Sequence, residues 1–171
     1  MIPLLISLHL LCAADDASPR LAAMKKLDHW VGRWKGSGWS MNDKGQRFDF
    51  TLTESVQQKV AGTVLLLDGQ GIRKNDKGQE STTHDGLVII SYDEKTHRYH
   101  WHGHDVGRDP VNAELKMIDG AMQWELHTAN NGPTIRFTIK IDGNRWHETG
   151  EVSLDGKAWN NFMEVTLERQ K

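Results

Sequence analysis

The segment Tyr99–Asp105 reads Tyr-His-Trp-His-Gly-His-Asp and holds three of the chain's nine histidines. In a β-strand, His100, His102 and His104 would point to one side at intervals of about 6.6–7 Å. Histidines at i and i+2 can share a zinc ion, and three protein ligands plus water make a catalytic zinc site. Three histidines on one straight strand span too far to converge on one ion. If Trp101 faces a barrel interior, the histidines face solvent, so we expect no metal there.

Two carboxylates fall on a face that is otherwise apolar. In strand phase, Glu54 is grouped with Phe50 and Leu52, and Glu148 is grouped with Trp146. A buried carboxylate is costly unless it is hydrogen-bonded, burial raises its pKa, and such groups often mark functional sites. The two groups would hydrogen-bond donor groups of a ligand. Alternatively, they bond one another, an indole N–H or trapped water and only fix the strand register.

The residues expected around these carboxylates define the ligand class. By the same phase rule, Asn161 points inward and would orient the ligand, while Trp101, Trp124 and Trp146 line the interior. Barrels that hold a fatty acid typically use an inward arginine, but Arg136 and Arg145 fall on outward phases. The sequence therefore favours a small, largely apolar ligand that is neutral or weakly cationic, and it disfavours a free fatty acid.

No arrangement in the sequence amounts to a catalytic signature. There is no G-x-S-x-G turn and no Gly-rich strand-to-helix turn. Three hypotheses stay open: a binding barrel, an enzyme that uses the interior carboxylates or a histidine-bound metal, and a filled barrel that acts as a structural or interaction module. The binding barrel is the preferred hypothesis, and an enzyme is the less favoured one.

The elements that would position these residues are one helix followed by strands. Ser18 and Pro19 suit an N-cap and a first helical position, and apolar residues recur at helical spacing up to Val31. From Gly32 onward the apolar residues alternate with period two. The expected strands are 33–41, 46–58, 62–73, 86–93, 97–105, 111–118, 121–128, 134–141, 145–153 and 159–169. The segment from Lys74 to Asp85 is expected to be a surface loop.

Alternation and turn chemistry together favour an all-β, up-and-down antiparallel barrel of about ten strands. Asp-Gly pairs at Asp119, Asp142 and Asp155 suit the tight turns between adjacent antiparallel strands. Strand 134–141 carries apolar residues on one side and polar residues on the other, as every wall strand of a barrel requires. Residues 15–171 are expected to form this single domain.

Gly32-Arg33-Trp34 lies where the helix passes into the first strand, and Arg169 lies in the last strand. This arrangement resembles the G-x-W signature of lipocalins and other calycin barrels. The resemblance implies that Trp34 closes one barrel end and that Arg169 packs across its ring, which gains about 0.5–2 kcal/mol of cation–π energy.

The chain after residue 14 also resembles a bacterial family of lipocalin-like domains of unknown function, DUF fifteen-seventy-nine. The matching stretches are Leu27–Trp39, Asp155–Trp159 and Glu164–Arg169, together with Tyr92-Asp93 followed by Tyr99. This family implies a barrel and no established activity. The architecture is also similar to nitrobindin-like haem barrels, where a histidine near the C-terminus ligates the iron. The last strand here has no histidine, so haem is disfavoured and we expect no cofactor.

Charge and the N-terminal residues bear on partners and location. The formal net charge is -2, which argues against nucleic acid as a partner. Ile2–Leu11 is an apolar run too short to remain as a stable membrane span, and small residues follow it. This pattern predicts a cleavable signal peptide at residues 1–14, and hence a periplasmic or secreted bacterial protein. The single cysteine, Cys12, lies within that segment, so disulfides are excluded from the mature chain.

Overall fold

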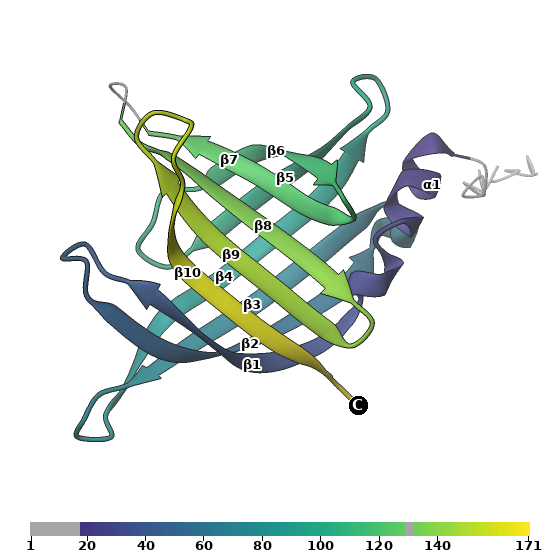
Figure 1. The fold of residues 1–171 in the computed structure, drawn as a ribbon. Coiled ribbons are helices and arrows are strands. Elements are labelled where there is room, and N and C mark those ends of the chain that lie inside the picture. Colours follow the sequence, from purple (N-terminus) through teal and green to yellow (C-terminus); the bar gives the residue numbers. More distant parts are fainter. Residues whose placement is uncertain (1–17, 129–131) are drawn as a thin grey trace, which may run out of the picture.

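A computed structural model describes residues 18–128 and 132–171. It shows a closed, ten-stranded antiparallel barrel with one short α-helix at its N-terminal end (Figure 1), which confirms the predicted fold class. The predicted signal peptide at residues 1–14 lies outside the described residues. Within the described part of the chain, no helix has the length and apolar character needed to cross a membrane.

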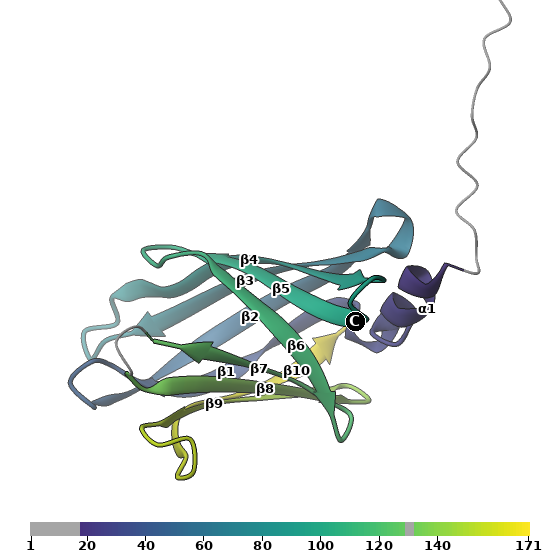
Figure 2. The same cartoon turned by 90° about the horizontal axis from the view of Figure 1, so that it is seen from above.

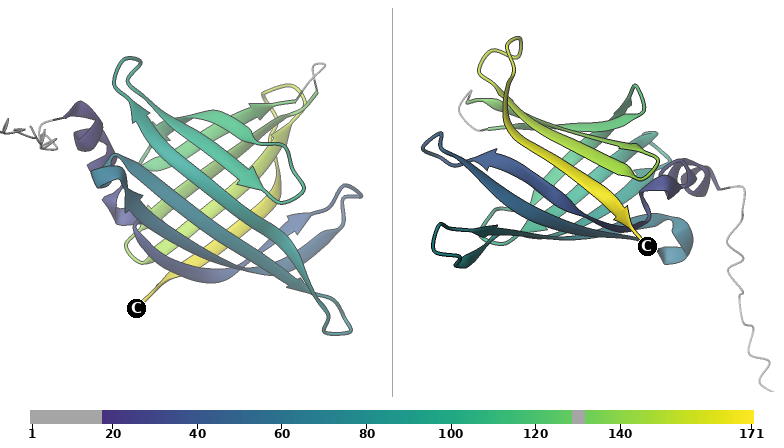
Figure 3. Two further views of the ribbon diagram at one scale, coloured as in Figure 1. Left: turned by 180° about the vertical axis from the view of Figure 1, so that it is seen from behind. Right: turned by 60° about the horizontal axis from the view of Figure 1, so that its bottom comes forward.

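The strands form an uninterrupted meander, in which each strand pairs with the next and the last returns to the first. Figure 3 shows β1 and β10 side by side where they close the wall. In their register, Trp34 is opposite Arg169. The strands are β1 Gly32–Met41, β2 Arg47–Lys59, β3 Val64–Lys74, β4 Glu80–Asp93, β5 Arg98–Asp105, β6 Val111–Ile118, β7 Ala121–His127, β8 Thr134–Asp142, β9 Arg145–Ser153 and β10 Asn160–Gln170.

The predicted loop from Lys74 to Asp85 is wrong, because β3 and β4 continue through most of it as a long hairpin. Only a tight turn separates them, and the side-chain oxygen of Asn75 accepts hydrogen bonds there from the backbone N–H groups of Lys77 and Gln79. The first three residues of β4 are exposed. Since this part of the hairpin has no core to face, it lacks the apolar alternation that identifies a strand in sequence.

The helix covers one end of the barrel (Figure 2). It runs as α1 over Pro19–Lys25 and is followed by a short 3₁₀ turn, η1, over Asp28–Trp30. A second 3₁₀ turn, η2, spans Val60–Gly62 between β2 and β3. Ser18 is the N-cap residue, but its hydroxyl donates to the Glu94 carboxylate, which also accepts the Arg20 N–H. Glu94 therefore ties the start of the helix to the turn after β4.

The core is concentrated under this helix. Tyr99 donates a hydrogen bond of 2.8 Å to the carbonyl of Ala23, and the Trp34 indole N–H donates to the carbonyl of Trp30. The guanidinium carbon of Arg169 lies 4.0 Å from the centroid of the Trp34 ring, which confirms the predicted calycin-type closure. The most completely buried large side chains are Met24, Leu27, Trp30, Trp34, Val56, Leu65, Ile90, Met122, Ile139, Trp146, Val165 and Leu167.

Candidate functional site

A row of register partners runs across the inner wall from β1 to β5, starting at Trp34 of the closed end. Trp34 of β1 pairs with Glu54 of β2, Glu54 with Gly69 of β3, Gly69 with Gly86 of β4, and Gly86 with Asp105 of β5. Directly opposed residues of antiparallel strands project to the same face of the sheet. Because Trp34 is a core residue, Glu54 and Asp105 also face the interior, with two glycines between them.

Glu54 lies flat against the wall in the space left by a glycine. A Cβ atom added at Gly69 would come within 2.6 Å of the Glu54 carboxyl carbon. The Glu54 side chain is only 11% exposed. Burial, followed by the nearby charges of Glu148 and Asp68, raises its pKa from 4.5 to about 8. Glu54 is therefore mostly protonated at neutral pH and can donate a hydrogen bond.

Glu148 also faces the interior, from β9. The indole N–H of Trp146 donates to its carboxylate at 3.2 Å. Burial raises the pKa of Glu148 to about 7, and the Trp146 hydrogen bond partly opposes that rise. Among the described residues, neither glutamate forms an ion pair with a lysine or arginine. The two buried carboxyls thus form a polar site without a lysine or arginine partner.

His84 lies between the two acidic residues of the register row, Glu54 and Asp105. Its ring covers Gly86, where an added Cβ would lie 2.5 Å from the imidazole Cε1. Its Nδ1 atom lies 3.2 Å from Oδ2 of Asp105, and its Nε2 atom lies 3.9 Å from Oε1 of Glu54. A register shift opposite Gly71 marks a bulge in β4 immediately before His84. Bulges often occur beside active sites because they redirect a side chain.

Asp105 is held as a carboxylate by several neighbours. Burial opposes its ionisation, but the backbone N–H of Asp85 and the charges of His84 and Arg108 keep its pKa below the usual 3.8. The Arg108 guanidinium lies 2.6 Å from Oδ2, and the Asp85 N–H donates to Oδ1 at 3.0 Å. Only 14% of the Asp105 side chain is exposed. Asp105 is thus a fixed negative charge beside His84.

The sequence analysis did not identify His84 and Asp105 as site residues, although their strand phase carried a signal. Asp105 shares parity with Trp101 in β5, and His84 shares parity with Val88 in β4, which faces the core. The prediction failed at His84 because the expected strand began at Gly86, two residues after His84, whereas β4 begins at Glu80. Alternation assigns a side chain to the inner or outer face only within a strand, so it made no assignment for a residue in the expected loop.

Aromatic side chains of β5, β7, β8 and β10 form an aromatic wall, which consists of Trp101, Trp124, Phe137 and Phe162. Trp101 stacks on Trp124 with ring centroids 4.2 Å apart, and Trp124 stacks on Phe137 at 5.2 Å. Phe162 meets Phe137 edge-on at 5.8 Å. Trp101 and Phe137 are only partly buried. The partly accessible outer members of this stack, Trp101 and Phe137, are the rings that a flat apolar molecule can contact.

The three tryptophans predicted to line the interior take different roles. Trp101 and Trp124 belong to the aromatic wall. Trp146 is only 1% exposed and packs edge-on against Trp30 and Trp34 at the closed end. Trp146 therefore positions Glu148 through its indole N–H, and its ring surface is already covered by protein.

The inward placement of Asn161 is wrong. Asn161 is exposed and pairs with Glu151, whose carboxylate binds the outward Arg136. A bulge in β10 between Asn161 and Met163 changes the phase of the strand. The extra residue, Phe162, covers Gly150 on the inner wall, where an added Cβ would lie 2.8 Å from its ring. Counting by twos from Met163 therefore assigns Asn161 to the wrong face.

The histidine stripe of β5 lies on the outer wall. His100, His102 and His104 alternate with Tyr99 and Trp101, which belong to the interior side. The rings of His100 and His102 are stacked at 6.1 Å, and His102 is hydrogen-bonded to Asn112 at 2.7 Å. Across residues 18–128 and 132–171, no group of three or more metal-binding side chains is placed to hold an ion.

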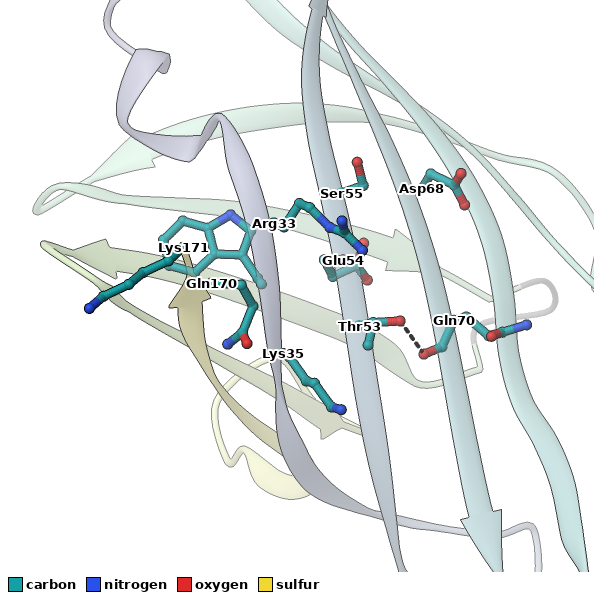
Figure 4. A pocket seen from close by; sticks show the side chains of 10 residues that line it. Arg33, Lys35, Thr53, Glu54, Ser55, Asp68, Gln70, Gln170 and Lys171 are labelled. Carbon is teal, nitrogen blue, oxygen red and sulfur yellow. Dashed lines mark hydrogen bonds between the residues drawn. The ribbon is translucent and has the colours of Figure 1, made fainter.

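A polar depression of about 490 Å³ lies on the outside of the barrel (Figure 4). Its side chains come from the outer faces of β1, β2 and β3 and from the end of the chain. A hydrogen bond from the Thr53 hydroxyl to the Gln70 carbonyl crosses it. Glu54 and Trp34 also border it, although both side chains belong to the inner face. The lining residues are Arg33, Trp34, Lys35, Thr53, Glu54, Ser55, Asp68, Gln70, Gln170 and Lys171.

No protein-family model matches the sequence, and no curated protein matches it. The predicted membership of DUF fifteen-seventy-nine is therefore not confirmed. Solved structures do share the fold. Rv2717c from M. tuberculosis is 14% identical with a TM-score of 0.61, covering 90% of this chain and 99% of that one. The S-type phycobiliprotein lyase CPES from Guillardia theta is 12% identical with a TM-score of 0.61, covering 87% and 93%. At these identities the likeness shows a common calycin-like barrel fold.

Proposed function

We propose that this barrel binds a small, largely apolar ligand in its interior, and that the ligand is flat and either neutral or weakly cationic. The observation that carries this proposal is the pair of inward carboxyls, Glu54 and Glu148, neither of which forms an ion pair with a lysine or arginine among the described residues. Burying a carboxyl is costly, so a ligand that hydrogen-bonds to these two groups would offset part of that cost.

The aromatic wall and the carboxyls suit different parts of one ligand. A planar apolar body would pack against the partly buried rings of Trp101 and Phe137, while its hydrogen-bonding groups would meet Glu54 and Glu148. Protonated carboxyls donate as well as accept hydrogen bonds. A neutral ligand is therefore accommodated directly, and a weakly basic ligand would draw a proton from one carboxyl.

The fold neighbours support a small-molecule role as a secondary argument. The similar barrel from Guillardia theta is named a phycobiliprotein lyase, which is compatible with small-ligand handling by this fold. The fold alone does not select the ligand, because one fold hosts many functions. The proposal for this chain therefore rests on its own carboxyls and rings.

Native mass spectrometry tests the proposal on protein purified without denaturation from its own host. We expect a retained small molecule in the wild type and its loss in a Glu54→Gln, Glu148→Gln double variant. Glu125→Gln, on the outward face of β7, is the matched control and should retain the ligand. A wild-type mass equal to that of the bare polypeptide favours instead the filled barrel that acts as a structural module.

We also propose that the protein is exported and acts in the periplasm or outside the cell. This location rests on the apolar run Ile2–Leu11 and the small residues before Asp15. Intact-mass measurement of protein made in a bacterial host should show a chain that begins at Asp15. A mature chain that keeps residues 1–14 and stays in the cytoplasm would contradict export.

A further inference from the structure

We propose that His84 and Glu54 form an acid–base pair that transfers protons on a bound substrate, and that Asp105 positions His84 for this role. The substrate class is planar, conjugated compounds that carry an acidic C–H bond. This inference rests on the proposed binding of a flat ligand in the barrel interior. It goes further by assigning chemistry to three residues whose juxtaposition only the fold creates.

The order of the three side chains across the sheet supports this pairing. Asp105, His84 and Glu54 follow one another across β5, β4 and β2, with contacts on both ring nitrogens of His84. A histidine held through one nitrogen by a buried carboxylate is a recurring arrangement for a general base. Nδ1 faces the Asp105 carboxylate at 3.2 Å, which favours the tautomer with hydrogen on Nδ1 and leaves the lone pair on Nε2.

Nε2 of His84 makes no hydrogen bond to Glu54. The distance of 3.9 Å to Glu54 Oε1 is longer than a hydrogen bond. The His84 side chain is 32% exposed, whereas Glu54 and Asp105 are 11% and 14% exposed. His84 is therefore the member of the trio that a molecule in solvent reaches most readily.

Glu54, the acid of the pair, keeps its proton at neutral pH. Glu54 faces Glu148 from β9, Asp68 from β3 and His84 from β4, and the carboxylate of Asp105 lies beyond the imidazole. Burial and the negative neighbours hold the Glu54 pKa near 8, and Arg108 is engaged by Asp105. A protonated carboxylic acid in an apolar site can donate a hydrogen bond to a developing oxyanion.

The reaction balances without an added oxidant, reductant or cofactor. His84 Nε2 takes the proton of the acidic C–H bond, and the electron pair of that bond moves through the conjugated system to an oxygen atom. The Glu54 hydroxyl donates its hydrogen bond, and then its proton, to that oxygen. Return of a proton from His84 to a different carbon and release of the oxygen-bound proton to Glu54 give an isomer and restore both residues.

A base-catalysed ring opening provides a direct probe. In 5-nitrobenzisoxazole, a flat aromatic molecule, loss of the C3 proton breaks the N–O bond and gives 2-cyano-4-nitrophenol, whose phenolate is followed by its absorbance. We expect the wild type to accelerate this reaction and His84→Ala to lower kcat/KM by about 100-fold, within the usual range for a general base. His84→Gln should behave in the same way while keeping a side chain over Gly86.

The outer histidines supply the matched control. His104→Ala removes an exposed imidazole from the outer face of β5 and should leave the rate unchanged. Asp105→Asn should lower kcat with little change in KM, and nitrogen NMR should show that His84 loses its preference for hydrogen on Nδ1. Glu54→Gln should remove the alkaline limb of the pH–rate profile, which the wild type should show near pH 8.

Binding of the probe, followed by quenching of tryptophan fluorescence, separates the two proposals. If the probe quenches the wild type but reacts at the same rate with His84→Ala, the acid–base pair is overturned and the binding proposal stands. If the probe neither quenches nor reacts, both proposals fail for flat apolar molecules. Circular dichroism of each variant confirms that the barrel is folded, so a rate loss in a folded His84→Gln protein supports the pair.

Discussion

The guanidinium of Arg169 covers the indole ring of Trp34 and also donates hydrogen bonds to the carbonyls of Val31 and His29. One residue of the last strand therefore links the first strand to the chain segment that leads out of the helix. An arginine fork can make both hydrogen bonds while stacking on a ring, which a lysine ammonium cannot do.

Arg169→Ala should lower the free energy of unfolding by about 2–4 kcal/mol, since it removes a cation–π contact and two charge-assisted hydrogen bonds. Arg169→Lys should recover less than half of that loss. Thermal and denaturant unfolding of both variants measure the effect. Lys35→Ala, an exposed change in β1, is the control, and an equal loss in it would remove the special role of Arg169.

Stability should depend on pH through Glu54 and Glu148. Their pKa values in the folded protein, about 8 and about 7, lie above the ordinary value of 4.5. The folded state therefore holds these protons more tightly, so their contribution is fully present below about pH 4.5 and is lost as the pH rises toward 8. We expect the free energy of unfolding to fall by a few kcal/mol between pH 5 and pH 8.5, an order-of-magnitude figure.

Glu54→Gln should flatten this decline, because glutamine keeps the shape of the protonated acid and does not ionise. The measurement is urea unfolding at a series of pH values for the wild type and for Glu54→Gln. Glu125→Gln, on the outer face of β7, should follow the wild-type curve. A wild-type stability that rises across the same pH window is incompatible with two buried, protonated glutamates.

Gly69 should tolerate a side chain only when the Glu54 carboxyl is removed. Gly69→Ala would place a Cβ against that carboxyl and should cost about 1–3 kcal/mol, as overpacking does. In a Glu54→Ala background the same substitution should cost much less, because the nearest atoms around the new Cβ all belong to Glu54. A double-mutant cycle measures this coupling energy, and additive costs would contradict the contact.

The bulge in β10 should make two neighbouring residues respond in opposite ways. Phe162→Ala removes a ring that covers Gly150 and meets Phe137, so it should cost about 1–3 kcal/mol, less than a fully buried phenylalanine. Asn161→Ala should change stability by less than about 0.5 kcal/mol, because that side chain is exposed. Retention of the interior ligand should follow the same order, with loss in Phe162→Ala alone.

The sequence by itself determined the wall of this barrel. Each strand that packs one face on the core must alternate apolar and polar residues, so period two and the Asp-Gly turns predict ten strands and their order. The same alternation placed Glu54 and Glu148 inside, and the G-x-W resemblance placed Trp34 under Arg169. These features depend on local geometry or on a motif, and both can be read along the chain.

The tertiary structure alone decided which side chains meet. The bulge at Phe162 breaks the counting by twos on which assignment to a face depends, and it has no reliable sequence signal. The register of the pairings from β2 to β5 brings Glu54, His84 and Asp105 together, although they are separated along the chain. Their meeting depends on strand register and on two glycines that leave room on the wall, so it follows from three-dimensional packing and not from residue spacing.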